Sequence, residues 1–425
     1  MSKKISDYYF LSLFSLIPIA IIIGPTISLI NILLIDISFI FILIKSQNFL
    51  FLKKKPVILI LIICVYLIFN SLISQDSSIG LKRNFGFIRF LILFIAFNYF
   101  FLKKDFFKKV FLVWLIVITL ACVDIYIEHF FGKNILGYAG SDAKYGDRIV
   151  SFFKDEPIIG TYLNAFYLLL IGFVSHLLGV SSYKKRLIIL IFSIILFFSI
   201  LLTGERSPLI KAFLALMIFY FINNSFNIKE KIFLVTILFF VSLGIFANSS
   251  FLKSRLLENN SISFFKSSES IKNTNLIVGN ENLYLTLFRS GLTVWKNYPL
   301  FGVGNKNYRI VTCKKSELIK FPEYICGNHP HQIYVEFLSE HGIIGGLILL
   351  TIIFKLIFKN LPILIKSKNY VQLGCFVFLL NVFLPLIPSG AFFGDFSSNF
   401  FWINMSILYA SNPNTNIFKN SNMKF

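Results

Sequence analysis

The chain has 425 residues, of which 56% are hydrophobic and only 14% are charged. A water-soluble chain of this length carries about 25% charged residues. The composition therefore excludes a cytosolic enzyme, a nucleic-acid-binding protein and a secreted domain. The formal net charge of +21 reflects a general preference for lysine, so the distribution of the charges is more informative than their sum.

Apolar stretches that could cross a bilayer recur along the whole chain. A hydrocarbon core about 30 Å thick requires roughly 20 apolar residues in a helix, and on this basis we expect about twelve spans. The predicted spans are 8–24, 27–45, 56–74, 85–102, 109–127, 157–180, 187–203, 208–222, 232–249, 342–358, 370–388 and 396–411. The sequence thus predicts an all-α polytopic membrane protein. Its parts would be the spans within 1–249, a loop domain with short helices over 250–341, and the last spans with a tail over 342–425.

The basic residues predict which ends of the spans face the cytoplasm. Short connections that are rich in lysine and poor in acids mark the cytoplasmic side of a membrane protein. Such connections hold Lys3, Lys4, Lys53, Lys54, Lys55, Lys103, Lys104, Lys108, Lys109, Lys184, Lys185, Arg186, Lys229, Lys231, Lys355, Lys359, Lys366 and Lys368. We therefore expect both termini in the cytoplasm and the long loop outside.

The segment 250–341 is the longest connection between predicted spans. It begins with a Ser/Asn-rich run over 259–282, for which we expect partial disorder. Apolar residues then recur at helical spacing over 283–296, which predicts an amphipathic helix on or near the outer membrane surface. Cys313 and Cys326 both lie in this loop, and an oxidising exterior permits a disulfide between them. Their presence in one loop by chance is the alternative.

The arginines are distributed differently from the lysines. All except Arg186 lie on the predicted external side or at its border: Arg83, Arg89, Arg148, Arg206, Arg255, Arg289 and Arg309. A guanidinium group is a planar, permanently charged donor that binds phosphate or carboxylate in a bidentate manner. Arg206 lies in a very short turn between two predicted spans, where it would suit the diphosphate of a membrane lipid. A salt bridge to Glu205 and snorkelling toward lipid headgroups are the alternatives.

Histidines gather on the same side, at His129, His329, His331 and His341. The run Asn328-His329-Pro330-His331-Gln332 ends the long loop, and 333–340 is predicted as a helix that starts at or near His331. A histidine, with an unperturbed pKa near 6.5, is suited to remove a proton from a sugar hydroxyl. Ordinary hydrogen bonding by the two loop histidines is the alternative.

A metal site built from His329, His331, Glu336, Glu340 and His341 is disfavoured. His331 and Glu336 would lie about 140° apart around a helix, so one ion could not easily reach both. The sequence also lacks a phosphate-binding G-x-x-x-x-G-K-[ST] loop, a D-x-D pair and a C-x-x-C pair. We therefore expect neither a metal nor another cofactor.

Taken together, these residues resemble the O-antigen ligase and polymerase superfamily of bacterial inner-membrane glycosyltransferases. The resemblance rests on the 203–207 turn, on Arg289 with Trp295 and 299–304, on 331–334 with Glu340, Gly342 and Gly345, and upstream on 148–153 and Gly160. Family members often have His-Asn where this chain has His331-Gln332, a departure that keeps an amide in place.

The resemblance implies transfer of a glycan from undecaprenyl diphosphate to an acceptor such as the lipid A core, at the periplasmic face. It implies that His331 is the catalytic histidine and that Arg206 and Arg289, with Arg148 as a further candidate, hold the diphosphate. His329 remains the alternative base, and Glu336 and Glu340 are supporting candidates. Metal-independent attack by the acceptor hydroxyl would invert the anomeric carbon.

Several functions remain open at the level of the sequence. One dominant external loop favours a ligase over a polymerase of the same superfamily. A protein O-oligosaccharyltransferase would need the same donor site with a different acceptor groove. A lipid or polysaccharide transporter is a further alternative, although polar residues gather at one face rather than around a central cavity. The sequence determines neither the acceptor, nor the glycan, nor the oligomeric state.

Overall fold

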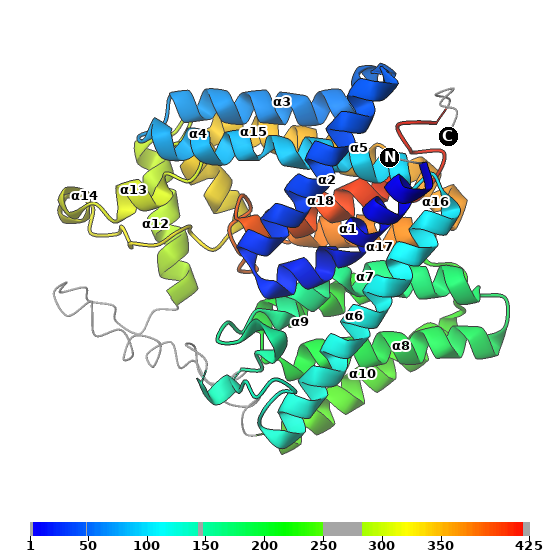
Figure 1. Cartoon of the computed structure of the whole chain (residues 1–425). Helices are drawn as coiled ribbons and strands as arrows, with labels where there is room; N and C mark the ends of the chain where they lie inside the picture. Colours follow the sequence, from blue (N-terminus) through cyan, green and yellow to red (C-terminus); the bar gives the residue numbers. More distant parts are fainter. Residues whose placement is uncertain (1–2, 48, 143–147, 250–282, 420–425) are drawn as a thin grey trace.

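The computed structural model describes residues 3–47, 49–142, 148–249 and 283–419 (Figure 1). Over these residues every regular element is a helix. The first are α1 (Lys3–Ile23), α2 (Pro25–Ser46), η1 (Leu50–Lys53), α3 (Lys55–Leu72), α4 (Ser77–Gly86), α5 (Ile88–Phe100), α6 (Lys104–Phe131), η2 (Gly140–Asp142), η3 (Ser151–Phe153), α7 (Ile159–Leu178), α8 (Tyr183–Leu202), α9 (Arg206–Ile222) and α10 (Ile228–Asn248). Then follow α12 (Leu283–Asn297), α13 (Tyr308–Thr312), α14 (Lys315–Lys320), α15 (Ile333–Phe358), α16 (Leu361–Ser367), α17 (Tyr370–Val382) and α18 (Asp395–Ala410).

The lengths of these helices confirm a polytopic helical membrane protein. Within the described residues, 8 candidate spans are long and apolar enough to cross a membrane, namely those at α1, α2, α3, α6, α7, α8, α10 and α15–α16. Four other predicted spans coincide with the shorter helices α5, α9, α17 and α18, of 13, 17, 13 and 16 residues. The count of twelve therefore stays a prediction.

Local sequence signals explain several helix ends. Gly24 adopts φ 142°, and Pro25 follows it as the first residue of α2, so the chain turns sharply between α1 and α2. Asn227 and Glu230 form a capping box at the start of α10. The predicted span 85–102 is interrupted, because α4 ends at Gly86 and α5 begins at Ile88.

The core of the bundle lies around α7, which packs against α17 on one side and α8 on the other (Figure 1). Two glycines let α7 and α17 approach closely. A Cβ atom on Gly172 would lie 2.3 Å from the Tyr370 carbonyl oxygen, and one on Gly374 would lie 2.3 Å from that of Leu168. Small residues permit such close helix packing in a membrane. This packing fixes α17, and with it the loop that leads to α18.

The predicted helix over 283–296 is present as α12, and α13 and α14 follow it in the same loop. These three short helices project to one side of the bundle in Figure 1. The polar run over 259–282 and Arg255 lie outside the described residues, so the prediction of partial disorder is not tested.

Candidate active site

The helix α15 is broken at Gly342, which adopts φ 65° and ψ −172°. Such a break leaves backbone groups on both sides without helical partners. The loop over 299–304 runs through the break and supplies the missing hydrogen-bond partners. The hydrogen bonds run from Ile343 N to Pro299 O (2.8 Å), Ile344 N to Leu300 O (3.1 Å), Val303 N to Ser339 O (3.0 Å) and Gly304 N to Glu340 O (2.9 Å). The break therefore separates a short helix that carries the histidine turn from the predicted span.

Asparagine side chains fix this loop to α3 and α4. Asn70 donates to the Phe301 carbonyl at 3.1 Å and accepts from the Asn305 backbone N–H at 2.8 Å. The Asn305 side chain in turn donates to Asn84 at 2.5 Å. All three asparagines are buried, and a buried amide is stable only when it is hydrogen-bonded. The loop is thus held rigidly beside the histidine turn.

His331 lies near the start of the helix, as predicted, directly before its N-cap. Gln332 is the N-cap of α15 and accepts from the Val335 N–H at 2.8 Å, and His331 precedes this cap with φ 56°. A left-handed conformation is uncommon for a residue other than glycine and is often found at functional sites. The His329 and His331 ring centroids lie 4.0 Å apart.

The loop between α17 and α18 connects the histidine turn to the turn that carries Arg206. The Ser389 N–H donates to the His331 carbonyl at 2.8 Å, and the Ser389 carbonyl lies 3.3 Å from His329 Nε2. The adjacent Pro388 carbonyl accepts a hydrogen bond from the Ser207 hydroxyl. Ser207 directly follows Arg206, which is exposed at the start of α9. Our sequence analysis missed this loop, although its Pro-Ser-Gly run is typical of a turn.

Arg289 lies on α12, the helix that packs on the histidine turn. A Cβ atom on Gly291 would lie 2.8 Å from Pro330 Cβ and 2.4 Å from Val335 Cγ1, so the two segments are in close contact. The Tyr284 ring meets the His331 ring edge-on at 6.0 Å between centroids. Arg289 itself is exposed, between these two contacts along the helix.

Burial and neighbouring positive charge keep both loop histidines neutral near pH 7. Burial, and next the charge of Lys306, lower the pKa of His329 to about 4. Burial and then His329 lower the pKa of His331, also to about 4. A neutral imidazole can accept a proton, which is what a general base must do.

Lys306 is a charged neighbour that our sequence analysis did not single out. Its charge acts on His329, Glu336 and Glu340, and its backbone adopts φ 64°. The glycine-rich run around it was recognised, but nothing in that run indicates where the lysine side chain would lie. Its position depends on how the loop crosses the break in α15.

Two carboxylates predicted as supporting residues hold loops in place. Glu336 is fully buried and accepts from the Phe392 N–H at 3.0 and 2.9 Å, which fixes the loop before α18. Glu340 is also fully buried and accepts from the Tyr308 N–H at 3.4 Å. Each carboxylate thus anchors a segment beside the histidine turn.

One comparison with known proteins gives a match. Residues 191–350 match a family model described as O-antigen ligase. This match supports membership of the O-antigen ligase superfamily. The matched range holds the Arg206 turn, α12, the loop over 299–304 and the histidine turn. No curated protein matches the chain.

Membership of the O-antigen ligase superfamily supports an enzyme related to glycosyltransferases and a lipid-linked glycan as the class of substrate. The family contains both ligases and polymerases, so membership does not distinguish between these reactions.

Two arginines of the predicted external group have structural partners. Arg83 Nη1 lies 2.6 Å from Asp395 Oδ2, and Arg89 Nη2 lies 2.7 Å from Asp395 Oδ1. These ion pairs fix the start of α18 to α4 and α5. At these two positions arginine therefore serves the fold.

Glu205 anchors the Arg206 turn to α7. Its buried carboxylate accepts from the Gly160 N–H at 2.5 Å and from the Thr161 hydroxyl at 2.8 Å. Burial raises the pKa of Glu205 to about 7, while these bonds and the charge of Arg148 lower it. The charge of Arg148 thus acts on the turn that carries Arg206.

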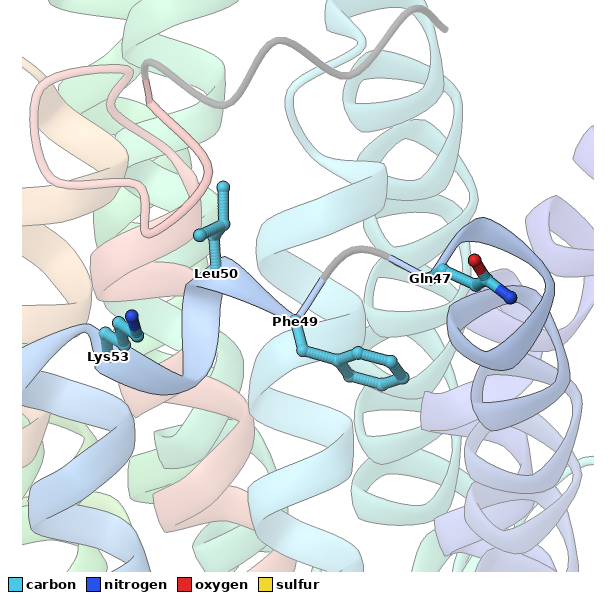
Figure 2. A pocket seen from close by; sticks show the side chains of 4 residues that line it. All are labelled: Gln47, Phe49, Leu50 and Lys53. Carbon is cyan, nitrogen blue, oxygen red and sulfur yellow. The ribbon is translucent and has the colours of Figure 1, made fainter.

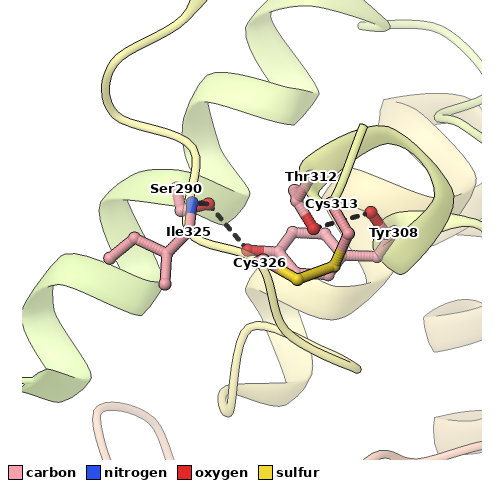
Figure 3. Close-up of a disulfide and its surroundings, with 6 residues drawn as sticks. All are labelled: Ser290, Tyr308, Thr312, Cys313, Ile325 and Cys326. Atoms are coloured by element: carbon pink, nitrogen blue, oxygen red, sulfur yellow. Dashed lines mark hydrogen bonds between the residues drawn. A yellow bond between two sulfur atoms is a disulfide. The ribbon is translucent and has the colours of Figure 1, made fainter. Parts of the chain in front are cut away.

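A disulfide joins Cys313 to Cys326, with 4.4 Å between their Cα atoms (Figure 3). It connects the end of α13 to the segment before the histidine turn. The Ser290 hydroxyl lies beside it, accepting from the Ile325 N–H at 3.0 Å and pairing with the Tyr308 hydroxyl at 2.7 Å. The disulfide and these bonds fix α12 and α13 to the chain that leads into the histidines.

Proposed function

We propose that this protein is an O-antigen ligase. It transfers a glycan from undecaprenyl diphosphate to a hydroxyl of the lipid A core. The observation that carries the proposal is the link between the histidine and arginine turns through Ser389 and Pro388. The two turns lie inside the range that matches the family, and the linking loop lies beyond it. A base and a diphosphate-binding cation are the two groups that this reaction requires of a protein.

In the proposed reaction the acceptor hydroxyl oxygen attacks the anomeric carbon of the donor. A new glycosidic bond forms as the bond from that carbon to the diphosphate oxygen breaks, and the electron pair leaves with undecaprenyl diphosphate. The hydroxyl proton passes to the neutral imidazole of His331. Arg206 and Arg289, with Arg148, stabilise the charge that grows on the leaving diphosphate. In-line attack inverts the anomeric carbon.

The donor itself would improve His331 as a base. A general base with a pKa near the working pH is more effective than one with a pKa near 4. Placing an anionic diphosphate beside an imidazole favours its charged form and raises its pKa. His331 would therefore stay neutral in the free enzyme and become more basic when the donor binds. His329 would act through its ring contact with His331 and its bond to Ser389.

The proposed topology has about twelve spans, with α5, α9, α17 and α18 as the short ones. Both termini would lie in the cytoplasm of a bacterial inner-membrane protein, and the 250–341 loop in the periplasm. The donor would reach the site from the outer leaflet, already activated, so no cofactor is needed. α12 would lie at the outer membrane surface.

One experiment tests the function directly. The purified protein, in nanodiscs, receives a lipid-linked glycan together with the lipid A core, a second lipid-linked repeat or an acceptor protein. We expect the lipid A core to be glycosylated and the His331→Ala variant to be inactive. The His129→Ala variant is a matched control, since His129 is an exposed histidine at the end of α6.

Each other product would replace the ligase assignment by a definite alternative. Extension of the second lipid-linked repeat would identify a polymerase, and glycosylation of the protein would identify an O-oligosaccharyltransferase. In sealed liposomes, movement of the intact lipid-linked glycan across the bilayer without transfer would identify a transporter.

A further inference from the structure

A group of lysines lies at the end of α3 and α15 that is farthest from the candidate active site. The two helices lie side by side (Figure 1). The loop over 299–304 joins the end of α3 to the break at Gly342. The other end of this helix pair, at Lys55 and Lys359, lies about 25 Å from the break, from the rise of a helix over that length.

This end of the helix pair contains a cavity of about 340 Å³, lined by Lys55, Leu59, Lys355, Phe358 and Lys359. All three lysines are exposed. None of them takes part in the ion pairs found among the described residues. The Lys54 and Lys55 charges repel that of Lys359. A bound anion would relieve this repulsion.

The connection that precedes α3 extends the same basic and apolar surface. A second hollow of about 470 Å³ is lined there by Gln47, Phe49, Leu50 and Lys53, whose side chains Figure 2 shows around the connection. Phe49 is 46% exposed and Leu50 is 60% exposed, beside the lysines. Exposed apolar side chains next to lysines are typical of a segment at the boundary between headgroups and acyl chains.

We propose that the cavity lined by Lys55, Lys355 and Lys359 binds the headgroup of an anionic phospholipid. The three ammonium groups would contact its phosphate oxygens. One acyl chain would run along Leu59 and the 42%-exposed Phe358. Basic pockets between membrane helices bind anionic headgroups in this way. A headgroup with two phosphates should be preferred, because three neighbouring cations can contact both.

The apolar residues decide between a lipid and a free phosphate compound. Leu59 and Phe358 offer nothing to a water-soluble anion, but they would gain from contact with an acyl chain. Leu59 lies one turn from Lys55 toward the middle of α3, where a lipid tail would extend, and Phe358 lies at the end of α15 between Lys355 and Lys359. The ligand is therefore a membrane component, and the proposal is independent of the reaction at the histidine turn.

Native mass spectrometry and thermal unfolding of the full chain in neutral detergent test this proposal. The probes are cardiolipin, phosphatidylglycerol, phosphatidylcholine and inorganic pyrophosphate. We expect cardiolipin to bind most tightly and to raise the unfolding midpoint, phosphatidylglycerol to follow, and the other two to have no effect. A Lys355→Gln/Lys359→Gln variant should bind cardiolipin about thirtyfold more weakly, from the usual contribution of a lysine at an anionic surface.

The control is Lys366→Gln/Lys368→Gln, which removes the same charge from exposed lysines that do not line the cavity. This variant should bind cardiolipin within about twofold of the original protein, since screening weakens distant charges. Lys355→Arg/Lys359→Arg should also keep the affinity. Equal losses in the two glutamine variants, or equal stabilisation by pyrophosphate, would overturn the proposal.

Discussion

The backbone N–H of Ser389 donates to the carbonyl of His331 at 2.8 Å, although these residues lie in loops separated by a long helix and α17. The carbonyl of the preceding Pro388 accepts from the Ser207 hydroxyl. One short loop thus sets the separation between the histidine turn and the turn that carries Arg206. Under the proposed function, this loop would keep the base and the diphosphate-binding cation at a fixed separation.

The Ser207→Ala variant tests this relationship. It removes the hydrogen bond to Pro388 and should lower kcat about three- to tenfold, which is the usual worth of one hydrogen bond. Thermal unfolding should change little, because Ser207 is only partly buried. Ser225→Ala is the control, since Ser225 contacts the other end of α17 through Tyr370 at 2.7 Å. Equal activity of the two variants would argue against a role for the loop in alignment.

The His331→Gly variant tests the proposed base. Glycine accepts φ 56° without strain, so the backbone should keep its conformation while the imidazole is lost. Transfer should fall by about 10²- to 10⁴-fold, which is the usual contribution of a general base. Added free imidazole should restore part of the activity. If rescue occurs instead for His329→Gly, the base is His329.

The pH dependence of transfer should differ between the free enzyme and its donor complex. The pKa of His331 is about 4 in the free enzyme. Because kcat/KM reports the free enzyme, kcat/KM should decrease only when the pH drops below about 4. The anionic donor raises this pKa, so the acidic limb of kcat should lie at higher pH. A kcat limb at or below that of kcat/KM would contradict diphosphate binding beside His331.

The same histidines should make the fold sensitive to acid. Their pKa values are about 4 in the folded protein and near 6.5 for an ordinary histidine. As the pH falls, the unfolded chain therefore binds protons at a higher pH than the folded protein does. Stability that is fully present above pH 6.5 should be lost as the pH falls toward 4. The His329→Gln/His331→Gln variant should lose less stability over this range in thermal unfolding measurements.

The Arg206→Lys variant tests the diphosphate site. Lysine keeps the positive charge but loses the planar bidentate geometry, so activity should fall about tenfold or more. Arg83→Lys is the control, because Arg83 pairs with Asp395 and a lysine would keep a salt bridge there. Activity should be measured at saturating acceptor with varied donor. Full activity of Arg206→Lys would count against the diphosphate role.

The Gly342→Ala variant tests the break in α15. Its Cβ atom would lie 2.3 Å from the Leu300 carbonyl carbon, at a residue with φ 65°. We expect a loss of about 1–3 kcal/mol in the free energy of unfolding, together with lower activity. Gly346→Ala is the matched control on the same helix, since the nearest atom would be 3.7 Å away. Equal stability of the two variants would show that the loop does not depend on the break.

The sequence was sufficient for the features that depend on local patterns. Apolar runs predicted the membrane class and the positions of the helices, and α12 formed where its periodicity indicated. The family could be recognised from short motifs, and the family model agrees over 191–350. The catalytic role of His331 stays a prediction, and its left-handed conformation before the N-cap was not expected.

The tertiary structure decided which side chains meet. Arg83 and Arg206 both belong to the predicted external group of arginines. Arg83 pairs with Asp395, 312 residues away. Arg206 directly precedes Ser207, which contacts the loop that bonds to the histidine turn. Local sequence constrains only the φ/ψ angles and the face of a helix, whereas these contacts depend on how α17 and α18 pack. Charge and turn propensity are local properties of the chain, whereas the link between the histidine turn and the Ser207 turn is a property of its packing.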